Sequence, residues 1–196
     1  MEKNLKGRDL QGQNLAGADL TDADLREANL DHADLESADL TGANLANADL
    51  RSANLRGVKL NAANLRGARL DDADLEGAKL MDADLAGACL MHANLKGNEL
   101  RGNNLTNTYL GGANLKSADL TGANLANADL RSANLTNTYL RGANLTNAGL
   151  SGADLTNADL TGANLRGANL TNAGLKGTRG LPLRHRLSYQ LRDFRL

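Results

Sequence analysis

Few side chains in this sequence could carry out chemistry, and two of them lie close together. Cys89 and His92 are three residues apart, so a thiol nucleophile and an imidazole base could in principle meet. Such a pair needs a group that orients the histidine, and no acidic residue lies beside it in the same five-residue segment. We therefore predict an exposed thiol and a solvated imidazole rather than a catalytic pair.

Other patterns that could carry chemistry are also absent from the sequence. The glycines do not form a phosphate-binding loop but recur at intervals of five residues. The aspartates are numerous and periodic, which is typical of hydrogen bonding at chain turns. The sequence thus predicts no catalytic residue, no cofactor and no metal site, and it indicates that the protein is not an enzyme.

A repeat of five residues governs most of the chain and must position all of these side chains. Leucine occupies every fifth position from Leu5 to Leu175, which gives 35 leucines in unbroken register. Alanine lies two residues before leucine at 27 of the 32 positions from Ala18 to Ala173. The residue directly before leucine is Asp or Asn in 26 of 35 segments, and Gly or Asn lies two residues after leucine in 24 of 35.

A period of five fits neither a helix nor an uninterrupted strand, but it fits a short strand that bends in every repeat. The alanine and the leucine are two residues apart, so both face the same side of an extended segment. Because five is odd, a continuing strand would turn the next pair outward, and a corner must therefore follow each leucine. The Gly/Asn position supplies this corner, since both residues accept a positive φ.

Two features set the number of sides in each coil. Residues other than Asp or Asn directly before leucine are separated from one another by multiples of ten residues, with Gly174 as the exception. The 19-residue segment Ser37–Leu55 recurs unchanged as Ser117–Leu135, an offset of 80. Both observations favour a 20-residue coil with four sides, since a two-sided coil would have no interior. The predicted core includes Leu20, Leu40, Leu60, Leu80, Leu90, Leu100, Ala18, Ala38 and Ala78.

The pattern resembles the pentapeptide-repeat family, whose A(D/N)LXX motif occurs here as Ala18-Asp19-Leu20 and Ala43-Asn44-Leu45. The resemblance covers residues 5–177 and implies an all-β fold, a right-handed quadrilateral parallel β-helix, here of about eight coils. Family members of the quinolone-resistance type bind DNA gyrase or topoisomerase IV by mimicking duplex DNA. Unlike some members, this chain has no phenylalanine in the inward leucine column.

The two ends depart from the repeat. We expect residues 1–16 to form an N-terminal cap or a frayed first turn, because Lys3, Arg8 and Gln13 replace the inward alanine. Residues 17–178 form the β-helix, and residues 179–196 are predicted to form a short C-terminal helix. One face of that helix carries Leu183, Leu187, Leu191 and Phe194. This stripe either only caps the last coil or also pairs with a second copy, and we expect a homodimer.

Several residues depart from the repeat within the rod. Asn98, Asn103 and Thr108 replace the inward alanine in three successive repeats, so they either mark a widened coil or bond to neighbouring backbone. Tyr109 and Tyr139 fall on opposite faces and do not form one aromatic patch. His32 and His92 are separated by three coils, so at about 14 Å from each other they cannot share a metal ion.

The net charge varies more along the rod than between its four faces. The net charge is −1, yet residues 1–50 hold 11 acidic and 4 basic residues and residues 151–196 hold 3 and 7. The balance excludes a generic nucleic-acid-binding protein, no apolar run could span a membrane, and no secretory signal is predicted. The single cysteine favours the cytoplasm.

Two functions from different classes remain open. The first is a non-catalytic protein-interaction scaffold, in its specific form a DNA-mimicking modulator of a type II topoisomerase. The alternative is a passive, stable structural rod, natural or consensus-designed, with no specific partner.

Overall fold

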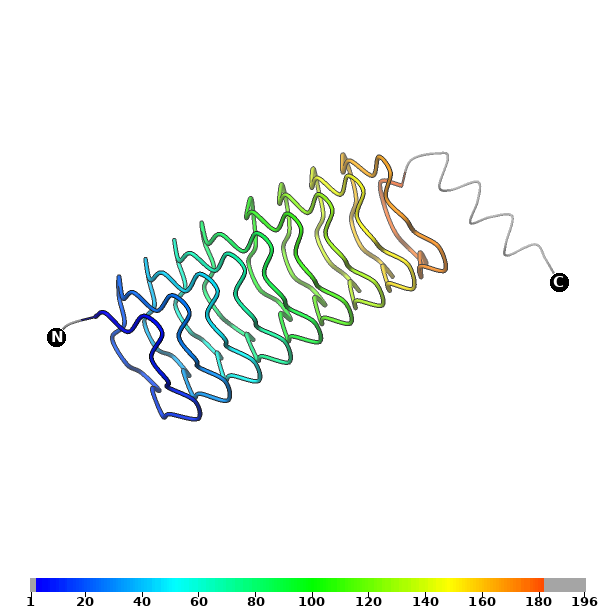
Figure 1. The fold of residues 1–196 in the computed structure, drawn as a ribbon. Coiled ribbons are helices and arrows are strands. Elements are labelled where there is room, and N and C mark those ends of the chain that lie inside the picture. The colour runs from blue at the N-terminus through cyan, green and yellow to red at the C-terminus, as the bar shows by residue number, and fades with distance from the viewer. Residues whose placement is uncertain (1–2, 182–196) are drawn as a thin grey trace.

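The computed structural model of the protein describes residues 3–181 of the 196-residue chain. The chain winds into a rod of stacked coils that runs from the N-terminal coil to the C-terminal coil without a break (Figure 1). In this part of the chain there is no α-helix, and therefore no helix that could cross a membrane. Each side of a coil contributes one bridging residue instead of a longer strand.

A constant register relates each coil to the next. Parallel bridges join each residue that precedes a leucine to the residue 20 positions later, from Asn4–Asp24 to Asp159–Arg179. Bridges occur at every fifth residue, so four fall in each coil and the coil has four sides, as predicted. The Leu25 N–H donates to the Asn44 carbonyl of the following coil at 2.8 Å, and equivalent bonds recur along the rod.

A tight turn forms each corner. At the Leu25 corner, the Ala28 N–H donates to the Leu25 carbonyl at 3.1 Å, and Glu27 between them has a φ of 60°. This is the pattern of a type II turn, in which the third residue takes a positive φ. The predicted corner position is therefore confirmed, although many corners use residues with a Cβ, such as Ala62 (φ 55°) and His92 (φ 59°).

The core consists of stacked leucines and alanines. The inward-facing residues Leu40, Leu60, Leu80, Leu90, Leu100, Ala38 and Ala78 are at most 3% exposed. Leu20 is 8% exposed and Ala18 is only partly buried, because both lie on the first coil. The predicted helix residues Leu183, Leu187, Leu191 and Phe194 lie outside the described residues.

The first coil follows the same path as the others. Asn4, Asp9 and Asn14 all form bridges to the second coil. The Lys3 ammonium donates to the Asp19 carboxylate at 3.0 Å and to the Thr21 carbonyl at 2.7 Å. Lys3 thus joins the first and last sides of this coil.

The corner conformation predicts opposite effects for two neighbouring alanines. Ala62→Gly should raise the free energy of unfolding by about 1 kcal/mol, because glycine relieves the strain of alanine at positive φ. Ala63→Gly should lower it by about 1–2 kcal/mol, because it deletes a buried methyl group and adds backbone freedom. Urea unfolding of both variants measures these changes, and a destabilised Ala62→Gly variant would contradict the corner geometry.

Candidate interaction faces

The four sides of the rod are of two kinds. We name each face after its first buried leucine, so the Leu20 and Leu30 faces are opposite, as are the Leu25 and Leu35 faces. On the Leu25 and Leu35 faces every bridging residue is Asn or Asp except Gly174. On the Leu20 and Leu30 faces the bridging residues also include Lys59, Arg69, Lys79, Cys89, Glu99, Tyr109, Tyr139, Gly149 and Arg179.

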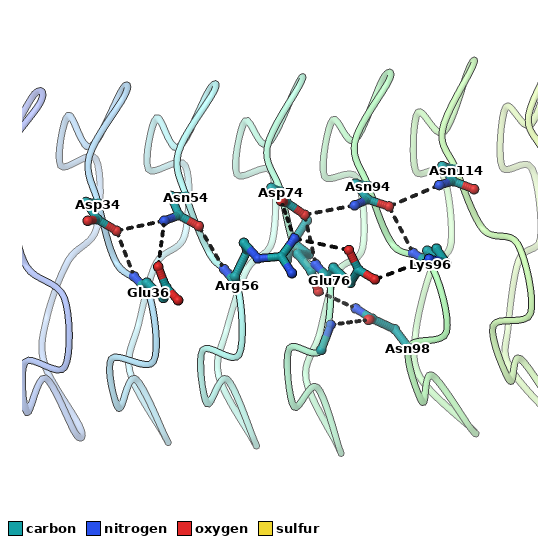
Figure 2. A network of polar contacts seen from close by, with 12 residues as sticks. Asp34, Glu36, Asn54, Arg56, Asp74, Glu76, Asn94, Lys96, Asn98 and Asn114 are labelled. Atoms are coloured by element: carbon teal, nitrogen blue, oxygen red, sulfur yellow. Dashed lines mark hydrogen bonds and ion pairs between the residues drawn. The ribbon is translucent and has the colours of Figure 1, made fainter.

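The Asn and Asp side chains of the uniform faces are engaged in bonds within the rod. The Asn94 side-chain oxygen accepts the N–H of Lys96 at 3.3 Å, which closes the corner. The Asn94 amide donates to Asp74 at 2.9 Å and the Asn114 amide donates to Asn94 at 3.1 Å, so neighbouring coils are joined outside the backbone (Figure 2). These residues serve the architecture and leave little for a partner.

Charged residues on the Leu35 face neutralise one another between coils. The Arg56 guanidinium lies 2.9 Å from the Asp74 carboxylate and 3.1 Å from the Glu76 carboxylate (Figure 2). Lys96 approaches Glu76 from the other side at 3.4 Å. Arg56, and then Lys96, hold the pKa of Glu76 below its usual range. This strip of alternating charge therefore has a weak net field.

The variable faces carry the large exposed side chains. Met81 on the Leu20 face is 66% exposed, and Tyr139 on the same face is 50% exposed. On the opposite Leu30 face Met91 is 43% and Tyr109 53% exposed. Exposed aromatic and methionine side chains are enriched at protein interfaces. As the sequence predicted, the two tyrosines belong to different faces.

Cys89 is the most reactive residue type on the Leu30 face, but its surroundings suppress its reactivity. Its thiol donates to the Asp71 carboxylate on the preceding coil, with 2.6 Å between Sγ and Oδ1. Partial burial, and then the bond to Asp71, raise the pKa of Cys89 to about 11. Asp71 belongs to another coil, so the residues next to Cys89 in the sequence do not indicate this contact. The 20-residue register between coils does indicate it.

The histidines of residues 3–181 do not belong to a cluster of metal-binding side chains. His32 and His92 both occupy corners with positive φ. The His32 Nδ1 lies 2.9 Å from the Asp31 carboxylate, in a pair that contains no nucleophile. Among residues 3–181 no three histidine, cysteine or carboxylate side chains gather to hold a metal ion.

A shallow depression of about 320 Å³ lies near the C-terminal end of the Leu20 face. It is lined by Asn137, Tyr139, Arg141, Asn157, Asp159, Gly177 and Arg179. The Arg141 guanidinium donates to Asp159 at 2.6 Å. Hydrogen bonds from Thr161, and then from Arg141, lower the pKa of Asp159 to about 2, so this pair is ionised at neutral pH. The depression combines an aromatic ring with polar groups, which suits contact with a protein side chain.

The Cys89 environment predicts slow alkylation at neutral pH. The rate with iodoacetamide should rise about tenfold for each pH unit until the pH nears 11, since only the thiolate reacts. Asp71→Asn removes the neighbouring negative charge, so it should lower the pKa of Cys89 and speed alkylation at pH 8. A wild-type rate that levels off at about pH 8.5, the range of a free thiol, would contradict the observed contact.

Comparison with known proteins identifies the family. The sequence profile described as Pentapeptide repeats matches in eight copies, over residues 4–42, 28–67, 59–97, 99–137, 123–162 and 148–179. The chain belongs to this family, whose fold is a right-handed β-helix. Among curated proteins, none matches the chain significantly.

Two solved structures are similar to the chain. HetL, a pentapeptide repeat protein involved in heterocyst differentiation regulation from the cyanobacterium Nostoc sp. strain PCC 7120, is 38% identical. The match covers 89% of this chain and 88% of HetL, with a TM-score of 0.49. A trypsin-treated form of QnrB1, a plasmid-mediated fluoroquinolone resistance protein, is 22% identical over 93% of this chain and 83% of its own, with a TM-score of 0.52.

Proposed function

We propose that this chain is a non-catalytic rod that binds a protein partner through its Leu20 and Leu30 faces. The contrast between the two kinds of face carries this proposal. On the Leu25 and Leu35 faces, bonds between coils account for the uniform Asn and Asp residues. On the other two faces the bridging position is free to vary, and it holds the tyrosines and several charged residues. Recognition by exposed rings and charges needs no pocket and no reactive group.

The partner that we propose is a type II topoisomerase such as DNA gyrase. The family resemblance supports this choice, as does the fold likeness to QnrB1, a fluoroquinolone resistance protein. The acidic N-terminal part of the rod would meet the basic surface on which the enzyme holds duplex DNA. Residues 1–50 hold 11 acidic and 4 basic residues, enough for the field of this end to resemble that of a DNA segment.

A supercoiling assay tests the partner directly. The full chain, added to DNA gyrase and relaxed plasmid, should inhibit supercoiling at low micromolar concentration by competing with DNA. The matched control is the triple variant Asp9→Asn, Asp19→Asn and Asp39→Asn, which changes bridging residues of the Leu30 and Leu20 faces only. Asparagine keeps the corner bond, as Asn44 does with the Ala46 N–H at 3.2 Å, but it removes the charge. We expect the variant to be weaker by about tenfold.

Equal inhibition by the chain and its amide variant would contradict DNA mimicry. If neither protein affects gyrase, nor binds it in a pull-down with purified enzyme, the topoisomerase is not the partner. The passive rod is then the better reading, and the identical copies Ser37–Leu55 and Ser117–Leu135 would favour it.

We further propose that the protein forms a homodimer through its C-terminal segment. Leu170, on the last coil, is only partly buried within the described residues, so this end has apolar surface to cover. Residues 151–196 hold 7 basic and 3 acidic residues, so pairing of two such ends brings like charges together. The dimer should therefore tighten as salt screens this repulsion.

Light scattering of the intact chain tests the dimer. We expect a dimer in solution, and a monomer for the double variant Leu187→Asp, Phe194→Asp. Circular dichroism of the variant should match that of the intact chain, since both positions follow the last repeat of the β-helix. An intact chain that stays monomeric at tens of micromolar would overturn the dimer.

A further inference from the structure

Two adjacent inward alanine columns are interrupted in one coil, where Asn98 and Asn103 replace alanine. Both side chains are buried, at 2% and 3% exposed. The Asn98 amide donates to the Leu75 carbonyl at 3.0 Å, and its oxygen accepts the Gly77 N–H at 3.2 Å. The Asn103 amide donates to the Leu80 carbonyl at 2.7 Å. Both asparagines thus bond to backbone of the preceding coil, one of the two readings that the sequence left open.

The backbone beside Asn98 and Asn103 also agrees with the other prediction from the sequence, a widened coil. Elsewhere in the rod, backbone N–H groups of the Leu20 face form short hydrogen bonds to the next coil. Leu60 donates to the Lys79 carbonyl at 2.7 Å and Ala62 donates to the Met81 carbonyl at 2.8 Å. One coil later, the bridges remain, but four backbone pairs among residues 78–104 lose ordinary hydrogen-bond geometry. The four N–H groups are those of Leu80, Asp82, Glu99 and Asn104.

The opening is confined to one side of the rod. On the Leu35 and Leu30 faces the same two coils stay bonded, with Leu75 to the Asn94 carbonyl at 2.9 Å and Leu90 to the Tyr109 carbonyl at 2.7 Å. In Figure 1 the upper corners are most widely separated between the coils near residues 80 and 100, while the lower corners stay evenly spaced. The two coils therefore form a wedge that opens on the Leu20 face and at the adjoining part of the Leu25 face.

Thr138 shows that a polar residue in the column of Asn98 need not separate neighbouring coils. It lies 40 positions after Asn98, and its hydroxyl donates to the Leu115 carbonyl at 3.0 Å. The backbone bonds beside it persist, including Leu120 to the Tyr139 carbonyl at 2.8 Å. The hydroxyl only donates to the turn carbonyl, so the backbone ladder is left intact.

The asparagine amide differs because it also accepts a hydrogen bond. The Asn98 oxygen takes the Gly77 N–H at 3.2 Å. In a regular coil this N–H donates to a carbonyl of the following coil, as Gly57 does to the Glu76 carbonyl at 3.0 Å. The amide therefore replaces a ladder bond and holds the two coils apart. The equivalent oxygen of Asn103 is buried and has no hydrogen-bond partner among the described residues.

We propose that this wedge is a built-in joint that divides the rod into two arms. The joint lies between the coil that contains Leu80 and the coil that contains Leu100. Coil-to-coil contacts hold a solenoid together, so the weakest of these interfaces is where the rod bends and where local opening begins. The proposal concerns the motion of the rod and does not depend on the identity of its partner.

Residue-resolved hydrogen exchange of the full chain tests the joint. The amides of Leu80, Asp82, Glu99 and Asn104 should exchange at least about tenfold faster than their counterparts one coil earlier. These counterparts are Leu60, Ala62, Lys79 and Asp84, which bond at 2.7, 2.8, 2.8 and 3.0 Å.

Two matched variants exchange the residues of the joint with those of a regular coil. Asn98→Thr with Asn103→Ala gives the wedge the residues found at Thr138 and Ala143, and it should slow exchange at all four amides to the rate of their counterparts. Thr138→Asn with Ala143→Asn should speed exchange at Leu120 and Tyr139 by a similar factor and leave Leu60 unchanged.

Equal exchange rates in the two sets of wild-type amides would overturn the joint. So would fast exchange that persists in the Asn98→Thr, Asn103→Ala variant, because the asparagines would then not be its cause. If the Thr138→Asn, Ala143→Asn variant fails to fold, small-angle scattering of wild type and the closed variant decides. The closed variant should then be the straighter rod, and identical profiles would contradict the proposal.

Discussion

In each repeat, the residue two positions after leucine has a positive φ and turns the chain just before the next inward alanine. The rest of the architecture depends on this turn. Without it the odd period would send alternate alanine–leucine pairs into solvent. With it, every pair faces inward, and four turns return the chain to a point one coil further along. The preference for Gly and Asn at this position follows from the same requirement.

The turn also decides which surface positions are free. The Asn or Asp before each leucine closes the corner and bonds along the rod, which keeps two faces uniform. Some arginines one position after leucine reach the next coil, as Arg56 does toward Asp74, and others pair within their own coil, as Arg51 does with Asp49. Much of the surface charge is therefore consumed internally. The bridging positions on the Leu20 and Leu30 faces vary more, although Lys59 and Arg69 there also pair with Asp39 and Asp49.

The sequence was sufficient for the register of the fold, because spacing alone encodes it. It was less informative about contacts between coils, which join residues far apart along the chain. The carboxylate of Asp71 beside Cys89 is one example, and it reverses the expectation of a freely exposed thiol. The sequence singled out Asn98, yet Thr138 occupies the same column and leaves the backbone bonds beside it intact. Only the geometry of an amide that both donates and accepts distinguishes the two cases.

The register between coils makes the length of this rod adjustable in fixed steps. An insertion or deletion of a single repeat would rotate every later side chain onto the neighbouring face, and one of two repeats would move it to the opposite face. A change of one whole coil leaves every face in place. The identical segments Ser37–Leu55 and Ser117–Leu135 lie a whole number of coils apart, so unequal recombination between their coding sequences would shorten or lengthen the rod by complete coils. Such a protein can change its reach in evolution while each surface keeps its pattern.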